Sequence, residues 1–106
     1  MYIQKCILQN MEFEWDEQKN QTNIIKHGIS FQEAQELFND PKLLTYIDNR
    51  FNYEEIREIS IGQLLLPGQP VIVVLVVHTD RNGVMRIISA RRANKKERRR
   101  YEQQSV

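Results

Sequence analysis

The chain is organised around Val71–Tyr101, with the sequence VIVVLVVHTDRNGVMRIISARRANKKERRRY. Its first seven residues, Val71–Val77, are apolar and mostly β-branched, a pattern typical of a strand buried on both faces. Asn82-Gly83 predicts a tight hairpin turn, because such a turn needs residues with positive φ. Val84–Ala90 then reads as the returning strand and leads into a basic segment. A buried hairpin followed by a basic helix is therefore expected at the centre of the fold.

The length of the hairpin loop decides which side chains share a face. A two-residue loop would place His78 opposite Ile87. Because side chains alternate along a strand, this register predicts that His78 and Arg91 share one face and that Arg86 points to the other. A slip of one residue, or a longer loop, would exchange Arg91 for Arg86 and Arg92.

Shorter signals predict the other elements. Capping residues indicate three helices, at Glu17 to about His27, Phe31 to about Asn39, and Lys95 to about Gln104. Strands are expected at Glu12–Trp15, on an edge of the sheet, and at Leu43–Ile47 and Ile56–Leu64. The predicted order is β-α-α-β-β-β-β-α, so the fold class is α+β: an antiparallel sheet with two N-terminal helices and one C-terminal helix packed on it. Residues 1–10 are expected to be an N-terminal extension and residues 11–106 a single domain.

Composition excludes several classes of protein. The chain has 106 residues and one cysteine, so it fits one domain and has no intrachain disulfide. Its two histidines and its carboxylates show no recognised metal-ligand spacing, and we expect neither a metal nor a cofactor. No apolar run is long enough to span a membrane, and the N-terminus lacks the pattern of a signal peptide. A cytoplasmic protein is therefore expected.

Charge is distributed unevenly along the chain. Residues 1–80 contain six Lys and Arg against twelve Asp and Glu, whereas residues 81–100 contain nine Lys and Arg against one Glu. Seven of those nine are arginines, which suit the geometry of phosphate groups. The alternative is a solvated helix face. The clustering favours a surface that binds a polyanion.

Five segments together resemble the BrnT family of toxins, in the order and spacing of that family and across Met11–Tyr101. They are Phe13-Glu14-Trp15-Asp16, Lys26-His27-Gly28-Ile29-Ser30-Phe31, Val77-His78-Thr79, Arg86-Ile87-Ile88-Ser89-Ala90-Arg91-Arg92-Ala93 and Glu97-Arg98-Arg99-Arg100-Tyr101. The resemblance implies a bacterial type II toxin–antitoxin system, a fold similar to the RelE-type ribonucleases and metal-independent cleavage of RNA. It also implies a BrnA-like antitoxin with a ribbon-helix-helix DNA-binding domain. The N-terminal extension and the apolar segment Leu64-Leu65-Leu66 depart from the family pattern.

Metal-free RNA cleavage requires a base for the ribose 2′-OH, cations for the phosphate and an acid for the leaving 5′-oxygen. His78 and His27 offer groups that titrate near neutrality, and Tyr101 could donate a proton or stack on a base. We predict catalytic roles for His78, Arg91, Arg57 and Tyr101, with His78 and Arg91 as the leading pair. RNA binding is predicted at Lys26, Arg81, Arg86, Arg92, Lys95, Lys96 and Arg99.

Each of these residues also has a purely structural interpretation. His78 ends an apolar strand and would equally fit a hydrogen-bonded core histidine. His27 and Lys26 suit the C-terminus of a helix, where the macrodipole favours positive charge. Tyr101 would serve as the core anchor of its helix. Arg57 is either part of a site or paired with a carboxylate.

Two further functions compete with that of a ribonuclease toxin. The chain could be a non-catalytic nucleic-acid-binding or regulatory module that uses the same basic helix. It could also be an interaction subunit whose basic surface binds an acidic partner chain. Catalysis requires a constellation of functional groups in a cleft, whereas binding alone requires only the basic strip Lys95–Arg100.

Overall fold

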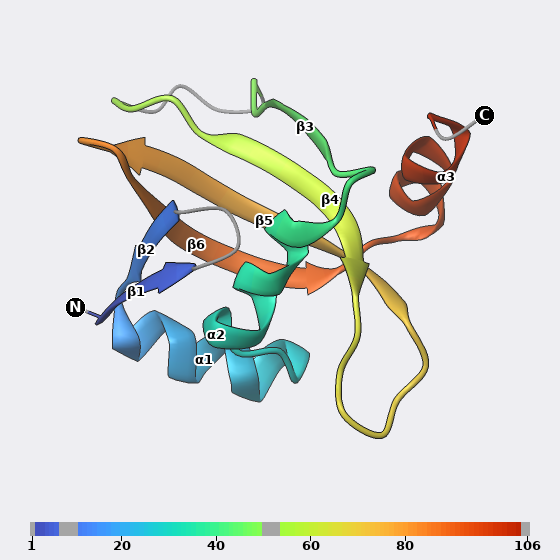
Figure 1. The fold of residues 1–106 in the computed structure, drawn as a ribbon, viewed down its shortest axis with the longest axis horizontal. Coiled ribbons are helices and arrows are strands. Elements are labelled where there is room, and N and C mark those ends of the chain that lie inside the picture. Colours follow the sequence, from blue (N-terminus) through green and yellow to red (C-terminus); the bar gives the residue numbers. More distant parts are fainter. Residues whose placement is uncertain (1, 7–10, 50–53, 105–106) are drawn as a thin grey trace.

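A computed structural model of the chain describes residues 2–6, 11–49 and 54–104, with residues 2–6 described as backbone only. It shows one sheet of six strands in the order β1-β2-β6-β5-β4-β3 (Figure 1). The strands are β1 (Tyr2–Cys6), β2 (Met11–Trp15), β3 (Leu44–Ile47), β4 (Glu58–Leu64), β5 (Ile72–Arg81) and β6 (Val84–Arg92). The helices are α1 (Glu17–His27), α2 (Phe31–Ala34), the 3-10 helix η1 (Gln35–Asn39) and α3 (Lys95–Gln103).

The α+β class is confirmed, but the prediction of an antiparallel sheet is wrong. The sheet is mixed because β2 pairs with β6 in parallel, with Phe13 opposite Met85. A parallel pair needs a long crossover between its strands, and here all the intervening helices and strands provide it. Strand β2 also does not lie at an edge, because β1 pairs with its other side. The predicted order lacks β1, and the second helix is shorter than predicted because η1 replaces its last turns.

The predicted starts of the three helices and the end of the first are confirmed by their capping geometry. The Asp16 carboxylate accepts hydrogen bonds from the first turn of α1, and Gly28 ends that helix with a φ of 69°. Capping boxes begin α2, with Ser30 and Glu33, and α3. The start of each helix is therefore determined by residues next to it in the sequence and not by contacts with distant segments.

Two apolar clusters lie on opposite faces of the sheet. On what we call the helical face, α2 and η1 pack Phe31, Leu37 and neighbouring side chains over the sheet. The buried members of this cluster are Phe13, Trp15, Ile29, Phe31, Ala34, Leu37, Phe38, Leu64, Leu66, Val74, Val76, Ile87 and Ala90. The cluster on the other face is smaller and comprises Ile59, Ile61, Leu75, Val77 and Tyr101. Figure 1 shows α3, which carries Tyr101, set apart from α1 and α2.

The central hairpin has the predicted two-residue loop, but further from the loop its register differs from the prediction. Asn82 and Gly83 take φ values of 55° and 82°, and His78 lies opposite Ile87 as predicted. A β-bulge then shifts the register between Val77 and His78, so that Val77 lies opposite Ser89. A bulge adds one residue to one strand, so all side chains beyond it change face relative to the partner strand.

Helix α1 is attached to the sheet by polar groups. Its only buried residues are Asn20 and Asn23. The Asn23 amide donates to the Ala90 carbonyl at 2.8 Å and accepts from the Ala90 N–H at 3.2 Å. The Asn20 side chain accepts from the Phe31 N–H at 2.8 Å. Asn23 thus satisfies the backbone of β6 where β2 no longer pairs with it, and α1 lies along this edge of the sheet.

Candidate functional site

The bulge separates the two residues predicted to act together. Arg91 lies opposite Leu75, a member of the smaller cluster, whereas His78 alternates with Val76 on the helical face. The prediction that His78 and Arg91 share one face is therefore wrong. The loop has the predicted length, but the extra residue at the bulge places Arg91 on the face opposite His78.

Three arginines project from the face opposite the helical face, which we call the arginine face. Arg86 lies opposite Thr79 on β5, two residues from Val77, and Arg91 lies opposite Leu75. Arg57 precedes β4 two residues before Ile59, so alternation directs it to the same face. The structure thus places Arg57, Arg86 and Arg91 on one face of the sheet. Arg57 and Arg86 lie on either side of β5 near Thr79, and Arg91 lies further along β6, opposite Leu75.

A buried carboxylate accompanies Arg86. Glu14 lies opposite Arg86 on β2, and an Arg86 Nη1 to Glu14 Oε1 distance of 3.5 Å joins the two side chains. Both side chains are almost buried, with exposed fractions of 13% and 11%. No hydrogen bond to Arg86 Nη1 is formed by the described residues. The pair is a loose ion pair whose guanidinium retains donors for another acceptor.

Three of the other predicted arginines have carboxylate or amide partners. Two Arg91 nitrogens donate to the two Glu97 oxygens, at 2.8 and 2.9 Å. Arg81 binds Glu55 in the same way, with two distances of 3.1 Å. These bonds are the main cause that lowers the pKa of Glu55, and the charges of Arg57 and Arg86 add to the effect. Arg92 donates to Gln69 at 3.3 Å. Arg57 and Arg86 therefore act on one carboxylate, which places their charges in the same region.

His78 has the environment of a core histidine. It is 2% exposed, its Nε2 lies 2.7 Å from Ser60 Oγ, and the Phe38 ring packs edge-on against it. Burial lowers the pKa of His78 to about 4, so the imidazole is neutral near neutral pH. Of the two interpretations left open by the sequence, the structure favours the hydrogen-bonded core residue.

Tyr101 anchors α3. It is 4% exposed, and its hydroxyl donates to Asp40 Oδ2 at 2.5 Å. Burial raises the pKa of Tyr101 well above its ordinary value, and the Asp40 carboxylate adds to the rise. A buried phenol that already donates to a carboxylate is a poor proton donor for a leaving group.

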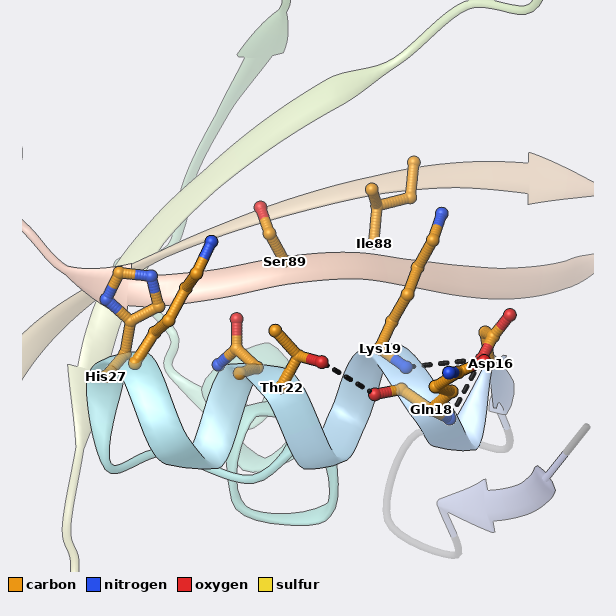
Figure 2. Close-up of a pocket in the computed structure, with 9 residues that line it drawn as sticks. Asp16, Gln18, Lys19, Thr22, His27, Ile88 and Ser89 are labelled. Atoms are coloured by element: carbon orange, nitrogen blue, oxygen red, sulfur yellow. Dashed lines mark hydrogen bonds between the residues drawn. The ribbon is translucent and has the colours of Figure 1, made fainter.

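A pocket of about 440 Å³ lies between α1 and β6. Figure 2 shows Lys19 and His27 rising from α1 toward Ser89 and Ile88 of β6. Lys26 also lines the pocket. Among the described residues, Asp16 contributes the one carboxylate of the lining, and the Gln18 and Lys19 N–H groups donate to it. The pKa of Asp16 is lowered chiefly by the Lys19 N–H, and the charges of Lys19 and Arg86 contribute, so Arg86 lies toward this end of the pocket.

The basic strip predicted on α3 is exposed. Lys95, Lys96 and Arg99 are exposed, and Arg100 lies 4.2 Å above the Tyr46 ring in a cation–π contact. The strip begins four residues after Arg91, whose guanidinium binds Glu97 of α3. The residues given for the lining of the α1 pocket belong to α1, its cap and β6 and not to α3.

Sequence reasoning missed Glu14, Lys19 and Ser89 and set His27 aside as a helix end. Glu14 alternates with buried Phe13 and Trp15, which was a signal that it faces away from the helical core. Lys19 and Lys26 are seven residues apart, two helical turns, so they share one side of α1. The position of Ser89 depends on the bulge, for which we find no signal in the sequence.

No helix in the described part of the chain is long and apolar enough to cross a membrane. No curated protein matched the sequence. A sequence model of the family described as "Ribonuclease toxin, BrnT, of type II toxin-antitoxin system" matches residues 15–97, which is more than half of the chain. The match includes Arg57, Arg86 and Arg91, together with the α1 pocket. The chain therefore belongs to the BrnT family of ribonuclease toxins, whose members act in type II toxin–antitoxin systems against RNA and with an antitoxin partner.

Proposed function

We propose that this toxin cleaves RNA without a metal ion, on the arginine face, with Arg86 at the scissile phosphate. The proposal rests mainly on the Glu14 carboxylate, which lies 3.5 Å from Arg86 on the face that also carries Arg57 and Arg91. The proposal includes a RelE-like relationship of the fold and a BrnA-like ribbon-helix-helix antitoxin. Both rest on the resemblance of the sequence segments described above.

The chemistry is a transfer of the phosphoryl group from the 5′-oxygen to the neighbouring 2′-oxygen. Glu14 takes the proton of the ribose 2′-OH as this oxygen attacks phosphorus. Arg86 donates to the phosphate oxygens, where negative charge accumulates, and Arg57 adds a second positive charge. The bond from phosphorus to the 5′-oxygen breaks, and water supplies the proton to that oxygen. The products are a 2′,3′-cyclic phosphate and a 5′-hydroxyl.

His78 and Tyr101 have no role in this mechanism. His78 lies on the helical face and binds Ser60, and Tyr101 binds Asp40. Arg91 is retained as a secondary phosphate contact, because its guanidinium is held by Glu97 but is about one-third exposed. The roles predicted for His78 and Arg91 thus pass to Glu14 and Arg86.

The α1 pocket extends the proposed site toward flanking nucleotides. Lys19 and Lys26 lie about 10.5 Å apart along the axis of α1, as two turns require. A single strand rising about 3.4 Å per nucleotide would pass about three phosphates over that length. Ser89 and His27 offer hydrogen-bonding groups along the same path. RNA therefore runs from Arg86 along the groove between β6 and α1.

The test is RNA cleavage by purified Arg86→Ala and Arg86→Lys, with EDTA present throughout. Arg86→Ala should lose about 10²–10³-fold in cleavage rate, the usual effect of removing one donor to the charge that develops during reaction. Arg86→Lys should recover part of the activity, because lysine keeps the charge but not the planar fork. Glu14→Gln should lose activity on a scale of about 10²–10⁴-fold as the base is removed.

Arg92→Ala is the matched control, because it removes an arginine of the same strand as Arg86 that lies on the helical face and whose partner, Gln69, lies outside the proposed mechanism. It should retain cleavage within about threefold, as most surface substitutions do. Circular dichroism must show all variants folded. Full cleavage by folded Arg86→Ala would refute the site, and loss of cleavage in EDTA would refute metal independence. RNA binding by the wild type without any cleavage would favour the non-catalytic module.

A further inference from the structure

A second pocket, of about 320 Å³, has the opposite charge from the α1 pocket. It is lined by Met11, Glu12, Glu58, His78, Asp80, Gly83 and Met85. Three of these residues are acidic and none is basic. Glu58 pairs with His78, and Asp80 pairs with Met85, so these side chains lie on the helical face. The pocket therefore faces away from the arginines that we assign to RNA.

His78 gives this pocket a polar atom that the fold does not use. The residue is 2% exposed, and its Nδ1 has no hydrogen-bond partner among the described residues. Its other nitrogen lies 2.7 Å from Ser60 Oγ, which in turn lies 2.8 Å from Thr45 Oγ1. If Nε2–H donates to Ser60 and Ser60 donates to Thr45, Nδ1 presents a lone pair. A buried polar atom without a partner is costly, so a ligand that supplies a donor gains that energy.

The chemistry of the lining fits a basic side chain. The carboxylates of Glu58 and Asp80, which both lie on the helical face, attract a cation and repel phosphate. The apolar side chains of Met11 and Met85 match the aliphatic stem of arginine or lysine. A guanidinium carries five donors and no acceptor, which suits a pocket whose polar groups are acceptors. Within the described residues, no group of His, Asp and Glu side chains has an arrangement that could hold a metal ion.

We propose that this pocket receives an arginine side chain of the antitoxin, with His78 Nδ1 and Glu58 as its acceptors. The antitoxin as partner follows from membership of the family, and the site on it is our inference. A basic residue of the antitoxin would then be held on the helical face while RNA is bound on the other. This contact anchors the partner without competing with the phosphates of RNA.

The first experiment measures the pocket alone. Isotope-labelled protein at neutral pH is titrated with N-acetyl-arginine amide, and with the norleucine analogue as the uncharged control. We expect the arginine probe to shift the amide signals around His78 and Asp80, and the His78 nitrogen spectrum to show the Nε2–H tautomer. Equal shifts with the norleucine analogue, or a protonated Nδ1 in the bound form, would overturn the proposal.

The second experiment measures the affinity of the toxin for its cognate antitoxin. Glu58→Gln/Asp80→Asn should weaken its binding to the toxin about 10- to 100-fold, as expected when a paired charge in an interface is removed. The control, Glu36→Gln/Glu102→Gln, removes the same number of charges at exposed positions outside the pocket and should change affinity less than about threefold. Equal losses of antitoxin affinity in both variants would show that only the overall charge of the toxin matters, and this result would overturn the proposed site.

RNA cleavage distinguishes this inference from the proposed function. Both double variants should cleave RNA at the wild-type rate, because none of the four residues takes part in the proposed mechanism. A toxin that fails to cleave RNA but binds arginine in this pocket would refute only the proposed function. A toxin that cleaves RNA but binds its antitoxin equally well with and without the carboxylates of Glu58 and Asp80 would refute only the pocket.

Discussion

His78 and Arg86 are both basic side chains in buried positions, but their surroundings differ. They lie on neighbouring strands, since Arg86 pairs with Thr79, the residue after His78, but they face opposite sides of the sheet. On the helical face, apolar packing keeps His78 neutral and lowers its pKa to about 4. On the arginine face, Arg86 remains charged with Glu14 beside it. The difference shows two ways to accommodate a basic side chain in a buried position: desolvation keeps His78 neutral, whereas a neighbouring carboxylate accompanies the charge of Arg86.

The largest effect is expected where the helical face is most closely packed. Leu37 is fully buried beneath the sheet, and Leu37→Ala should lower the free energy of unfolding by about 2–5 kcal/mol in urea titrations. Leu65, 73% exposed, provides the control, and Leu65→Ala should change stability by less than about 0.5 kcal/mol. Similar losses at both positions would remove the distinction between the helical face and the surface.

His78 should make the folded state sensitive to acid. Its folded pKa of about 4 lies below the ordinary value of 6.5, so the unfolded chain binds a proton in this window and the folded chain does not. Stability from this group is complete above pH 6.5 and falls as the pH drops toward 4, by about 3 kcal/mol in all. His78→Phe should flatten the dependence of unfolding free energy on pH between 6.5 and 4. An unchanged slope would show that His78 titrates normally.

A substitution of Tyr101 tests how much its hydrogen bond to Asp40 contributes to the attachment of α3. Tyr101→Phe removes the hydroxyl that donates to Asp40 and should cost about 1.5–3 kcal/mol, the usual range for a hydrogen bond to a charged group. Burial by itself would raise the pKa of Asp40, but hydrogen bonds from Tyr101 and from the Gln63 and Lys42 N–H groups lower it. Tyr46→Phe is the matched control and should cost less than about 0.5 kcal/mol in thermal unfolding. Equal costs would contradict a specific anchor.

The smallest effect concerns the route of RNA across the arginine face. In Lys19→Gln/Lys26→Gln, the slope of log affinity against log salt for a single-stranded RNA should decrease by about 1.4, because each phosphate that is no longer neutralised accounts for about 0.7. Lys95→Gln/Lys96→Gln removes two charges from α3 and should decrease the slope less. Fluorescence anisotropy at several salt concentrations measures both. The reverse order would direct the RNA along α3 instead of α1.

Local signals predicted most of the fold. Asp16 and the two capping boxes predicted where the three helices start, Gly28 predicted where the first one ends, and Asn82-Gly83 predicted the hairpin loop. These signals could be recognised in the sequence because each one sets the backbone conformation within a few residues. The parallel pairing of β2 with β6 depends on contacts between distant segments and left no local pattern. The prediction that His78 and Arg91 share a face was wrong for a smaller reason, because one extra residue at the bulge places Arg91 on the opposite face. A basic surface could be predicted from the distribution of charge along the sequence. The arginine that lies opposite Glu14 could not be identified in that way, because its position depends on the pairing of β2 with β6.

The hydrogen bonds of Asn23 bear on self-association. Strand β6 continues past the end of β2, and an unpaired stretch of this kind is a template for another chain. The Asn23 side chain occupies the Ala90 N–H and carbonyl as a neighbouring strand would. One amide therefore closes a segment of β6 that could otherwise pair with a second copy of the protein and start its aggregation.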